Sequence, residues 1–148
     1  MLKHHSLRIL FLALIFFGVR TFSLAQADPI ERLWYNEEKT AKIQVYKATD
    51  GRFYGKIVWL KEPLRDGKPK IDINNSDKSR RNDPIMGLLI LREFKKGSDK
   101  HYEDGTIYDP KNGKTYSCKM TLGGDKLDVR GYVGFSLLGR TTTWTKAD

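Results

Sequence analysis

The chain has 148 residues, of which 27 are lysine or arginine and 18 are aspartate or glutamate, giving a formal net charge of +9. Its length suits a single domain with a core of its own. Because the chain has one cysteine, it cannot form an internal disulfide. Because it has only three histidines besides, a zinc or multi-histidine catalytic site would need carboxylates for nearly all its ligands.

The first 27 residues have the order of parts that defines a secretory signal peptide. A basic flank precedes an apolar run over residues 9–19, and Ala25 and Ala27 form a small-x-small cleavage site. The apolar run is shorter than the roughly 18 residues that a membrane helix needs, and no later stretch reaches that length. We therefore expect a signal peptide over residues 1–27 and an exported domain over residues 28–148, with no transmembrane segment and no nucleic-acid partner.

After the leader, apolar residues alternate with polar ones and turn signals recur at short intervals, which is typical of antiparallel strands. The first strand is expected over residues 42–46, followed by a turn at 49–51 and a second strand over 53–59. The residues of the second strand that share one face in this pattern are Phe53, Gly55, Ile57 and Trp59. Further strands are expected over residues 86–94, 101–108, 114–122, 126–133 and 140–146.

The segment over residues 61–84 interrupts this regularity with three prolines and several turn signals. One helical turn is expected at residues 77–79, capped by Asn75 or Ser76. Loops of this length in compact domains are usually functional or mobile. We consider two interpretations, a lid that covers a barrel mouth and a solvated face held by local ion pairs. The basic residues predicted to make loop contacts are Lys68, Lys70 and Arg81.

Few side chains suggest chemistry of their own. Asp72, Asn74, Ser76 and Asp83 have the alternate spacing of a calcium loop, but the glycine and the final glutamate of that motif are missing and basic residues lie beside it. Cys118 lies on the apolar face of its strand, where a thiol behaves as a small hydrophobe. We therefore predict no metal site, no cofactor and no catalytic residue.

About eight short strands in meander order leave two exposed sheet edges, and closing the sheet on itself removes them. The sequence therefore predicts an all-β fold, a single antiparallel up-and-down barrel with one long loop. The same pattern permits a two-sheet sandwich, which is the alternative. A barrel of about eight strands is either filled by its side chains or holds one small ligand.

Several strings in fixed order resemble a known family. They are KIVWL at 56–60, DGKP at 66–69, GTIYDP at 105–110, NGKTY at 112–116, RGY at 130–132 and LGR at 138–140, followed by Trp144. Together they resemble the small exported bacterial proteins of domain-of-unknown-function family 2147, over the range from Trp34 to Trp144. The resemblance implies a lipocalin-like barrel, and it carries no activity with it. It also implies a structural cation–π contact between Trp34 and Arg140. The predicted signal peptide indicates a periplasmic or secreted location.

Two functions follow as hypotheses. In the first, the barrel binds a small amphipathic or acyl-type ligand in its interior. The aromatic residues predicted to line that interior are Phe53, Trp59, Tyr116 and Trp144. In the second, the protein is a cell-envelope module with a filled barrel that binds a protein or polysaccharide through its long basic loop or its outer face. An enzyme acting through paired carboxylates is a third alternative without a specific motif.

Overall fold

A computed structural model describes residues 26–147. The predicted signal peptide therefore lies outside the described residues, apart from its last two. The strands are β1 (Leu33–Tyr35), β2 (Ala41–Lys47), β3 (Phe53–Leu60), β4 (Leu64–Arg65), β5 (Lys68–Pro69), β6 (Leu89–Ser98), β7 (His101–Asp109), β8 (Lys114–Gly123), β9 (Lys126–Tyr132) and β10 (Gly139–Lys146). A single 3-10 turn, η1 (Lys78–Arg80), lies between β5 and β6.

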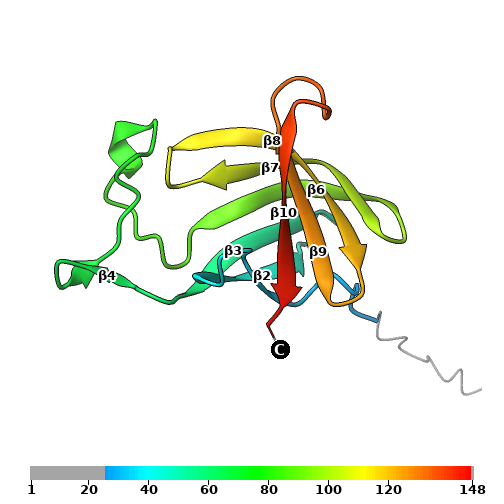
Figure 1. Ribbon diagram of the computed structural model, residues 1–148, viewed down its shortest axis with the longest axis horizontal. Helices are drawn as coiled ribbons and strands as arrows, with labels where there is room; N and C mark the ends of the chain where they lie inside the picture. The colour runs from blue at the N-terminus through cyan, green and yellow to red at the C-terminus, as the bar shows by residue number, and fades with distance from the viewer. Residues whose placement is uncertain (1–25, 148) are drawn as a thin grey trace, which may run out of the picture.

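Eight of these strands form one closed antiparallel barrel in the order β1-β10-β9-β8-β7-β6-β3-β2 (Figure 1). Strand β1 closes the sheet because it pairs with β2 on one side and with β10 on the other. Strands β4 and β5 form a separate hairpin within the long β3–β6 connection. The prediction of an up-and-down barrel with one long loop is confirmed, and the alternative of a two-sheet sandwich is wrong.

The observed elements differ from the predicted ones mainly at their ends. The three-residue strand β1 was not predicted, since it is too short to show an alternation. Strand β6 begins at Leu89 instead of residue 86, because Gly87 has a φ of 86° and Leu88 N donates to Ile85 O, forming a turn there. The helical turn is capped by Asp77, whose carboxylate accepts from Ser79 N, one position after Ser76 and two after Asn75, the two predicted caps.

One end of the barrel is filled by bulky inward side chains. Phe53 packs edge-on against Tyr102, with ring centroids 5.1 Å apart, and both side chains are buried. The ring of Phe94 lies over the backbone of Gly105, where an added Cβ would come within 2.4 Å of the ring. Cys118 is buried, and this burial raises the pKa of its thiol to about 12, as suits a small core hydrophobe.

The segment before β1 covers this filled end. Ile30 is fully buried, and its carbonyl accepts a hydrogen bond of 3.0 Å from Nε1 of the buried Trp34. The carboxylate of Asp28 accepts from the Tyr102 hydroxyl and from Lys96 Nζ, the latter at 2.6 Å. Burial alone would raise the pKa of Asp28, but the hydrogen bonds from Lys96 and Tyr102 outweigh it and lower that pKa. Burial and the bond to Asp28 raise the pKa of Tyr102.

Replacement of Gly105 tests how tightly the filled end is packed. Gly105→Ala is expected to lower the free energy of unfolding by about 1–3 kcal/mol, because its methyl group must displace the Phe94 ring. Gly131→Ala is the matched control, since the nearest atom to its new Cβ lies at 3.4 Å, an ordinary contact. Urea unfolding of both variants measures the difference, and equal stability of the two would contradict this account of the packing.

The Asp28 contact predicts a pH dependence of stability. Because its folded pKa lies below the ordinary 3.8, the contribution of Asp28 is fully present above that pH and is lost as the pH falls through the folded value. Asp28→Asn should therefore cost about 1–2 kcal/mol at neutral pH and progressively less in acid. Urea unfolding across this range checks the trend, and a gap between the two proteins that stayed constant in acid would refute it.

Candidate ligand cavity

The other end of the barrel is hollow and open. A cavity of about 980 Å³ begins in this half of the interior and extends past the rim to residues of the long loop. It exists because most inward positions here carry aliphatic side chains or glycine, with Tyr116 and Trp144 as aromatic exceptions, whereas the filled end carries phenylalanine, tyrosine and methionine. The aliphatic and aromatic side chains at its base are Ile43, Ile57, Ile90, Ile107, Val129 and Trp144. The base of the cavity is therefore apolar.

The rim of the cavity is polar, because four connections between strands meet at this end. The β1–β2 turn is closed by Asn36, whose Oδ1 accepts from Thr40 N at 2.8 Å and from Ala41 N at 2.9 Å. The β7–β8 turn is closed by Asp109, whose Oδ1 accepts from Lys111 N at 2.9 Å. The other two are the long β3–β6 connection and the β9–β10 connection over residues 133–138, here called the rim loop.

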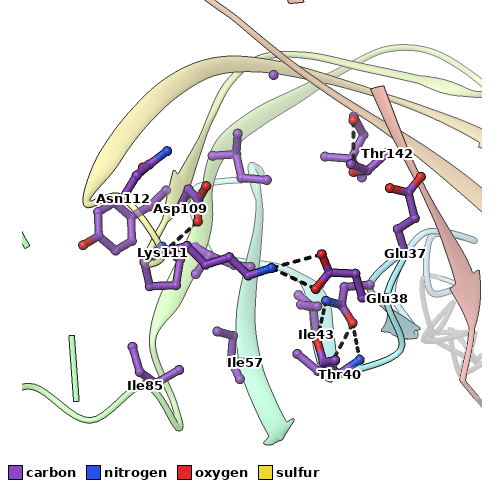
Figure 2. A pocket seen from close by; sticks show the side chains of 18 of the residues that line it. Glu37, Glu38, Thr40, Ile43, Ile57, Ile85, Asp109, Lys111, Asn112 and Thr142 are labelled. Carbon is purple, nitrogen blue, oxygen red and sulfur yellow. Dashed lines mark hydrogen bonds and ion pairs between the residues drawn. The ribbon is translucent and has the colours of Figure 1, made fainter. Parts of the chain in front are cut away.

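An ion pair crosses the mouth of the cavity. Lys111 Nζ donates to the two carboxylate oxygens of Glu38 at 2.8 and 3.1 Å (Figure 2). The two residues belong to turns on opposite sides of the barrel, three strands apart in either direction around the sheet. The hydrogen bond and the positive charge of Lys111 lower the pKa of Glu38. Both side chains are exposed, so the pair costs little to open.

Two further ion pairs balance charge around this mouth. Arg140 Nη2 lies 3.6 Å from Glu37 Oε2, and Lys70 Nζ lies 3.8 Å from Glu62 Oε2. All four residues line the cavity. The rim therefore carries both cations and anions. Each of these groups can break its present ion pair and bind a charged group of a ligand instead.

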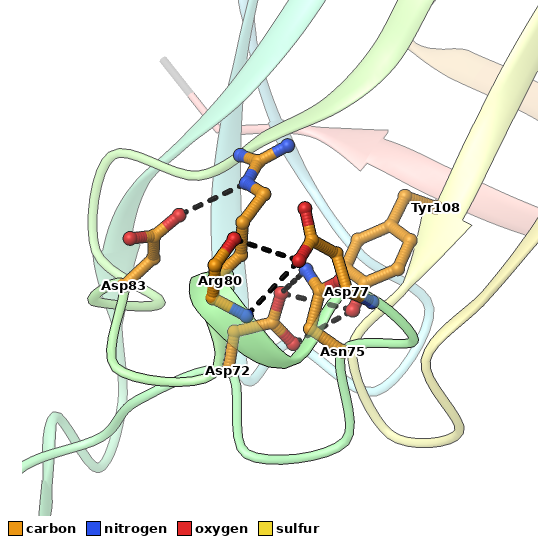
Figure 3. Close-up of polar contacts among 7 residues, drawn as sticks. Asp72, Asn75, Asp77, Arg80, Asp83 and Tyr108 are labelled. Carbon is orange, nitrogen blue, oxygen red and sulfur yellow. Dashed lines mark hydrogen bonds and ion pairs between the residues drawn. The ribbon is translucent and has the colours of Figure 1, made fainter.

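The long loop forms part of the cavity wall and is anchored to the barrel. Asp72 is fully buried, and its two carboxylate oxygens accept from the Tyr108 hydroxyl at 2.8 and 2.9 Å (Figure 3). Asn75 Nδ2 donates to the same carboxylate at 2.7 Å. Asn74 Nδ2 donates to Lys111 O at 3.0 Å, which joins the loop to the β7–β8 turn. Burial and the bond to Asp72 raise the pKa of Tyr108 to about 12.

The structure separates the four aromatic residues that were predicted to line the interior. Tyr116 and Trp144 line the cavity. Phe53 lies in the filled end instead, because it is the first residue of β3 at the end remote from the mouth. Trp59 lies on the outer face, 37% exposed, with its ring 6.0 Å from that of Tyr35.

A β-bulge explains the position of Trp59. Ile57 pairs with Ile43 and Trp59 pairs with Lys42, so Val58 is an extra residue between two successive pairs. An extra residue shifts every later side chain of the strand to the opposite face. The predicted inward run therefore ends at Ile57.

The predicted contact between Trp34 and Arg140 is wrong. Trp34 pairs with Lys146 at the end of β10, whereas Arg140 lies at the start of that strand and pairs with Gly131. The guanidinium of Arg140 forms its ion pair with Glu37 at the rim. Trp34 is instead buried in the core, where its Nε1 donates to the Ile30 carbonyl.

Of the predicted loop contacts, only Lys70 lies on the cavity. Lys68 lies in the exposed hairpin strand β5. Arg81 Nε donates to Asn75 O at 2.9 Å, within the loop itself.

In residues 26–147, no group of three histidine, cysteine, aspartate or glutamate side chains is arranged to hold a metal ion. None of the helical structure in the described part of the chain is long and apolar enough to cross a bilayer.

Comparisons with known proteins agree with this architecture. The model of a family of uncharacterised proteins conserved in bacteria, DUF2147, matches residues 33–146. The chain belongs to the DUF2147 family. Among solved structures, it is similar to protein HP1028 from the human pathogen Helicobacter pylori, described as belonging to the lipocalin family. The two share 19% identity with a TM-score of 0.72, over 80% of this chain and 83% of that one. No curated protein matches the sequence.

The buried contact between Asp72 and Tyr108 predicts how firmly the long loop is held. Tyr108→Phe should weaken the attachment of the loop by about 1–3 kcal/mol, because it removes the hydroxyl donor that the two oxygens of a buried carboxylate share. Cleavage within residues 61–84 by a protease should accelerate by about tenfold or more. In the unmodified protein, this bond is present below the ordinary tyrosine pKa of 10.0 and is lost as the pH rises through about 12.

Tyr46→Phe is the control, since its ring stacks on Tyr54 on the outer face of the barrel, away from the loop. Limited proteolysis of the three proteins, followed by mass spectrometry of the fragments, measures the effect. An unchanged cleavage rate in Tyr108→Phe would show that other contacts hold the loop.

Proposed function

We propose that the protein binds one small amphipathic or acyl-type ligand in the open half of its barrel. The observation that carries the proposal is the cavity of about 980 Å³ with an apolar base and a charged rim. Pockets of about 300–1,000 Å³ that combine apolar walls with a few polar groups are the usual sites for small molecules. An interior of this size also argues against the alternative of an envelope module, which required a filled barrel.

The distribution of polarity within the cavity specifies the orientation of the ligand. The hydrocarbon part lies against Ile57, Ile107 and Trp144 at the base, where each buried methylene contributes about 0.8 kcal/mol. The polar end lies at the mouth, between Lys111 and Glu38. An anionic group can take Lys111 from Glu38 without leaving a buried charge, because both partners are exposed to water.

The fold gives this proposal a second support. Eight-stranded barrels of the lipocalin type have interiors wide enough to hold one small ligand. From the signal peptide inferred for residues 1–27, we also propose that the protein is periplasmic or secreted. In that aqueous compartment it carries or senses an apolar molecule.

A substitution that occupies the cavity tests the site. Gly131→Trp places an indole between Ile107 and Tyr116, the two side chains nearest the new Cβ. The dissociation constant for the fluorescent fatty acid cis-parinaric acid should rise by about tenfold or more. Ser117→Trp is the matched control, because it adds the same side chain to the exposed outer face of the neighbouring strand β8. Fluorescence titration of the three proteins gives the affinities.

Equal affinity of Gly131→Trp and the unmodified protein, with both unfolding cooperatively in urea, would place the bound fatty acid outside this cavity. Native mass spectrometry of the protein purified from its own host complements the titration. A retained small molecule supports the proposal and identifies the ligand, and its loss from Gly131→Trp assigns it to the cavity.

A further inference from the structure

The rim loop, residues 133–138, exposes apolar side chains to an unusual degree. The exposed fractions are 68% for Val133, 79% for Phe135, 88% for Leu137 and 71% for Leu138, the four highest among the large apolar side chains of residues 26–147. Singly exposed apolar residues are common, but four in one six-residue segment mark a contact surface. The loop projects from the end of β9 and β10, away from the body of the barrel (Figure 1).

Four carbonyl groups of the rim loop are hydrogen-bonded within the protein. Arg130 Nε donates to Ser136 O at 2.7 Å, and Arg130 Nη2 donates to Leu137 O at 3.2 Å. Within the loop, Leu138 N donates to Phe135 O at 3.0 Å and Val133 N donates to Leu138 O at 3.4 Å. The four consecutive carbonyl groups of residues 135–138 therefore all have donors inside the protein. Unpaired backbone N–H and C=O groups are costly to transfer into lipid, so the pairing of these four carbonyl groups lowers that cost for the rim loop.

The charged residues next to the rim loop in the sequence are all basic, although Glu37 pairs with Arg140 across the rim. From Val129 to Ala147 the sequence contains no acidic residue, and it places Arg130 and Arg140 on either side of the loop. Apolar side chains flanked by cations are typical of segments that bind the interface of an anionic bilayer.

The rim loop is also continuous with the cavity. Val133 and Leu138, the first and last residues of the loop, line the cavity mouth, so apolar surface extends from the loop tip to the interior. A second copy of this chain is a poorer occupant, since a stable interface needs about 800 Å² from each partner and a projecting six-residue loop offers much less.

From these observations we infer that the rim loop inserts into the interface of an anionic lipid bilayer and brings the cavity mouth to the membrane surface. Phe135 and Leu137 enter between the lipid headgroups, and Arg140 faces the lipid phosphates. This inference goes beyond the proposed function, because the membrane contact does not depend on the cavity being occupied. It also implies that an apolar ligand enters and leaves the cavity at the bilayer surface.

The test is binding of the protein to vesicles made of equal parts phosphatidylglycerol and phosphatidylcholine, measured by co-sedimentation. The double variant Phe135→Ser, Leu137→Ser should bind these vesicles at least about tenfold more weakly. Leu64→Ser is the matched control, since Leu64 is 52% exposed in the β4–β5 hairpin and its loss should leave binding unchanged. Vesicles of pure phosphatidylcholine should bind the unmodified protein more weakly, as the flanking arginines require.

Binding of cis-parinaric acid without vesicles is measured on the same proteins. If the double variant keeps its affinity for this probe and loses the vesicles, the membrane contact is assigned to the rim loop. If the unmodified protein binds vesicles through the loop but not the probe, the proposed ligand function fails and the membrane contact stands.

Three outcomes would overturn the inference. The first is failure of the unmodified protein to bind either vesicle. The second is equal binding by the double variant. The third is a dimer of the unmodified protein that the double variant converts to a monomer in light scattering, which would assign the rim loop to contact between copies of the chain.

Discussion

The uneven distribution of bulky side chains along the barrel axis is the constraint from which the rest of the structure follows. A closed sheet of eight strands has a fixed circumference, so the size of its inward side chains decides whether a given level is solid or hollow. Phe53, Phe94 and Tyr102 fill one half, and Gly105 provides the space that lets the Phe94 ring lie flat. The other half has isoleucine, valine and Gly131 at equivalent positions and remains hollow.

The filled half gives the hollow half its rigidity. A cavity of this size removes packing contacts that would otherwise stabilise the fold, so cohesion must come from elsewhere. In this chain it comes from the packed aromatic residues and from the N-terminal segment that covers them through Asp28 and Ile30. The long loop adds a second support at the mouth, because the buried Asp72 holds it against Tyr108.

The alternation of apolar residues was enough to predict the strands and their closure into a barrel, because each turn signal fixes the direction of the next strand. The interior was harder to predict. Periodicity assigns Phe53 and Ile57 to the same face, but it does not show that one lies at the filled end and the other at the cavity. The bulge at Val58 has no sequence signal, so the outward position of Trp59 was missed.

Contacts between distant parts of the chain could not be predicted from the sequence, for a related reason. Glu38 and Lys111 are 73 residues apart, and only the order of strands around the barrel brings their turns face to face. Tyr108 and Asp72 meet in the same way across the long loop. Arg140 was assigned to the wrong partner because resemblance to a family supplies a pattern of residues without the register that places each one along its strand.

In the proposed ligand-binding function, the ion pair between Lys111 and Glu38 acts on the speed of ligand exchange, whereas the apolar base of the cavity acts on affinity. Interactions between exposed charges are screened by dissolved ions over about 10 Å at moderate ionic strength, whereas burial of hydrocarbon is hardly affected at such concentrations. Under that proposal, changes in the salinity of the surroundings would alter how often the ion pair opens while leaving the retention of a bound hydrocarbon chain almost constant. Entry of the proposed ligand and its retention would thus be governed by different forces at different depths of the same barrel.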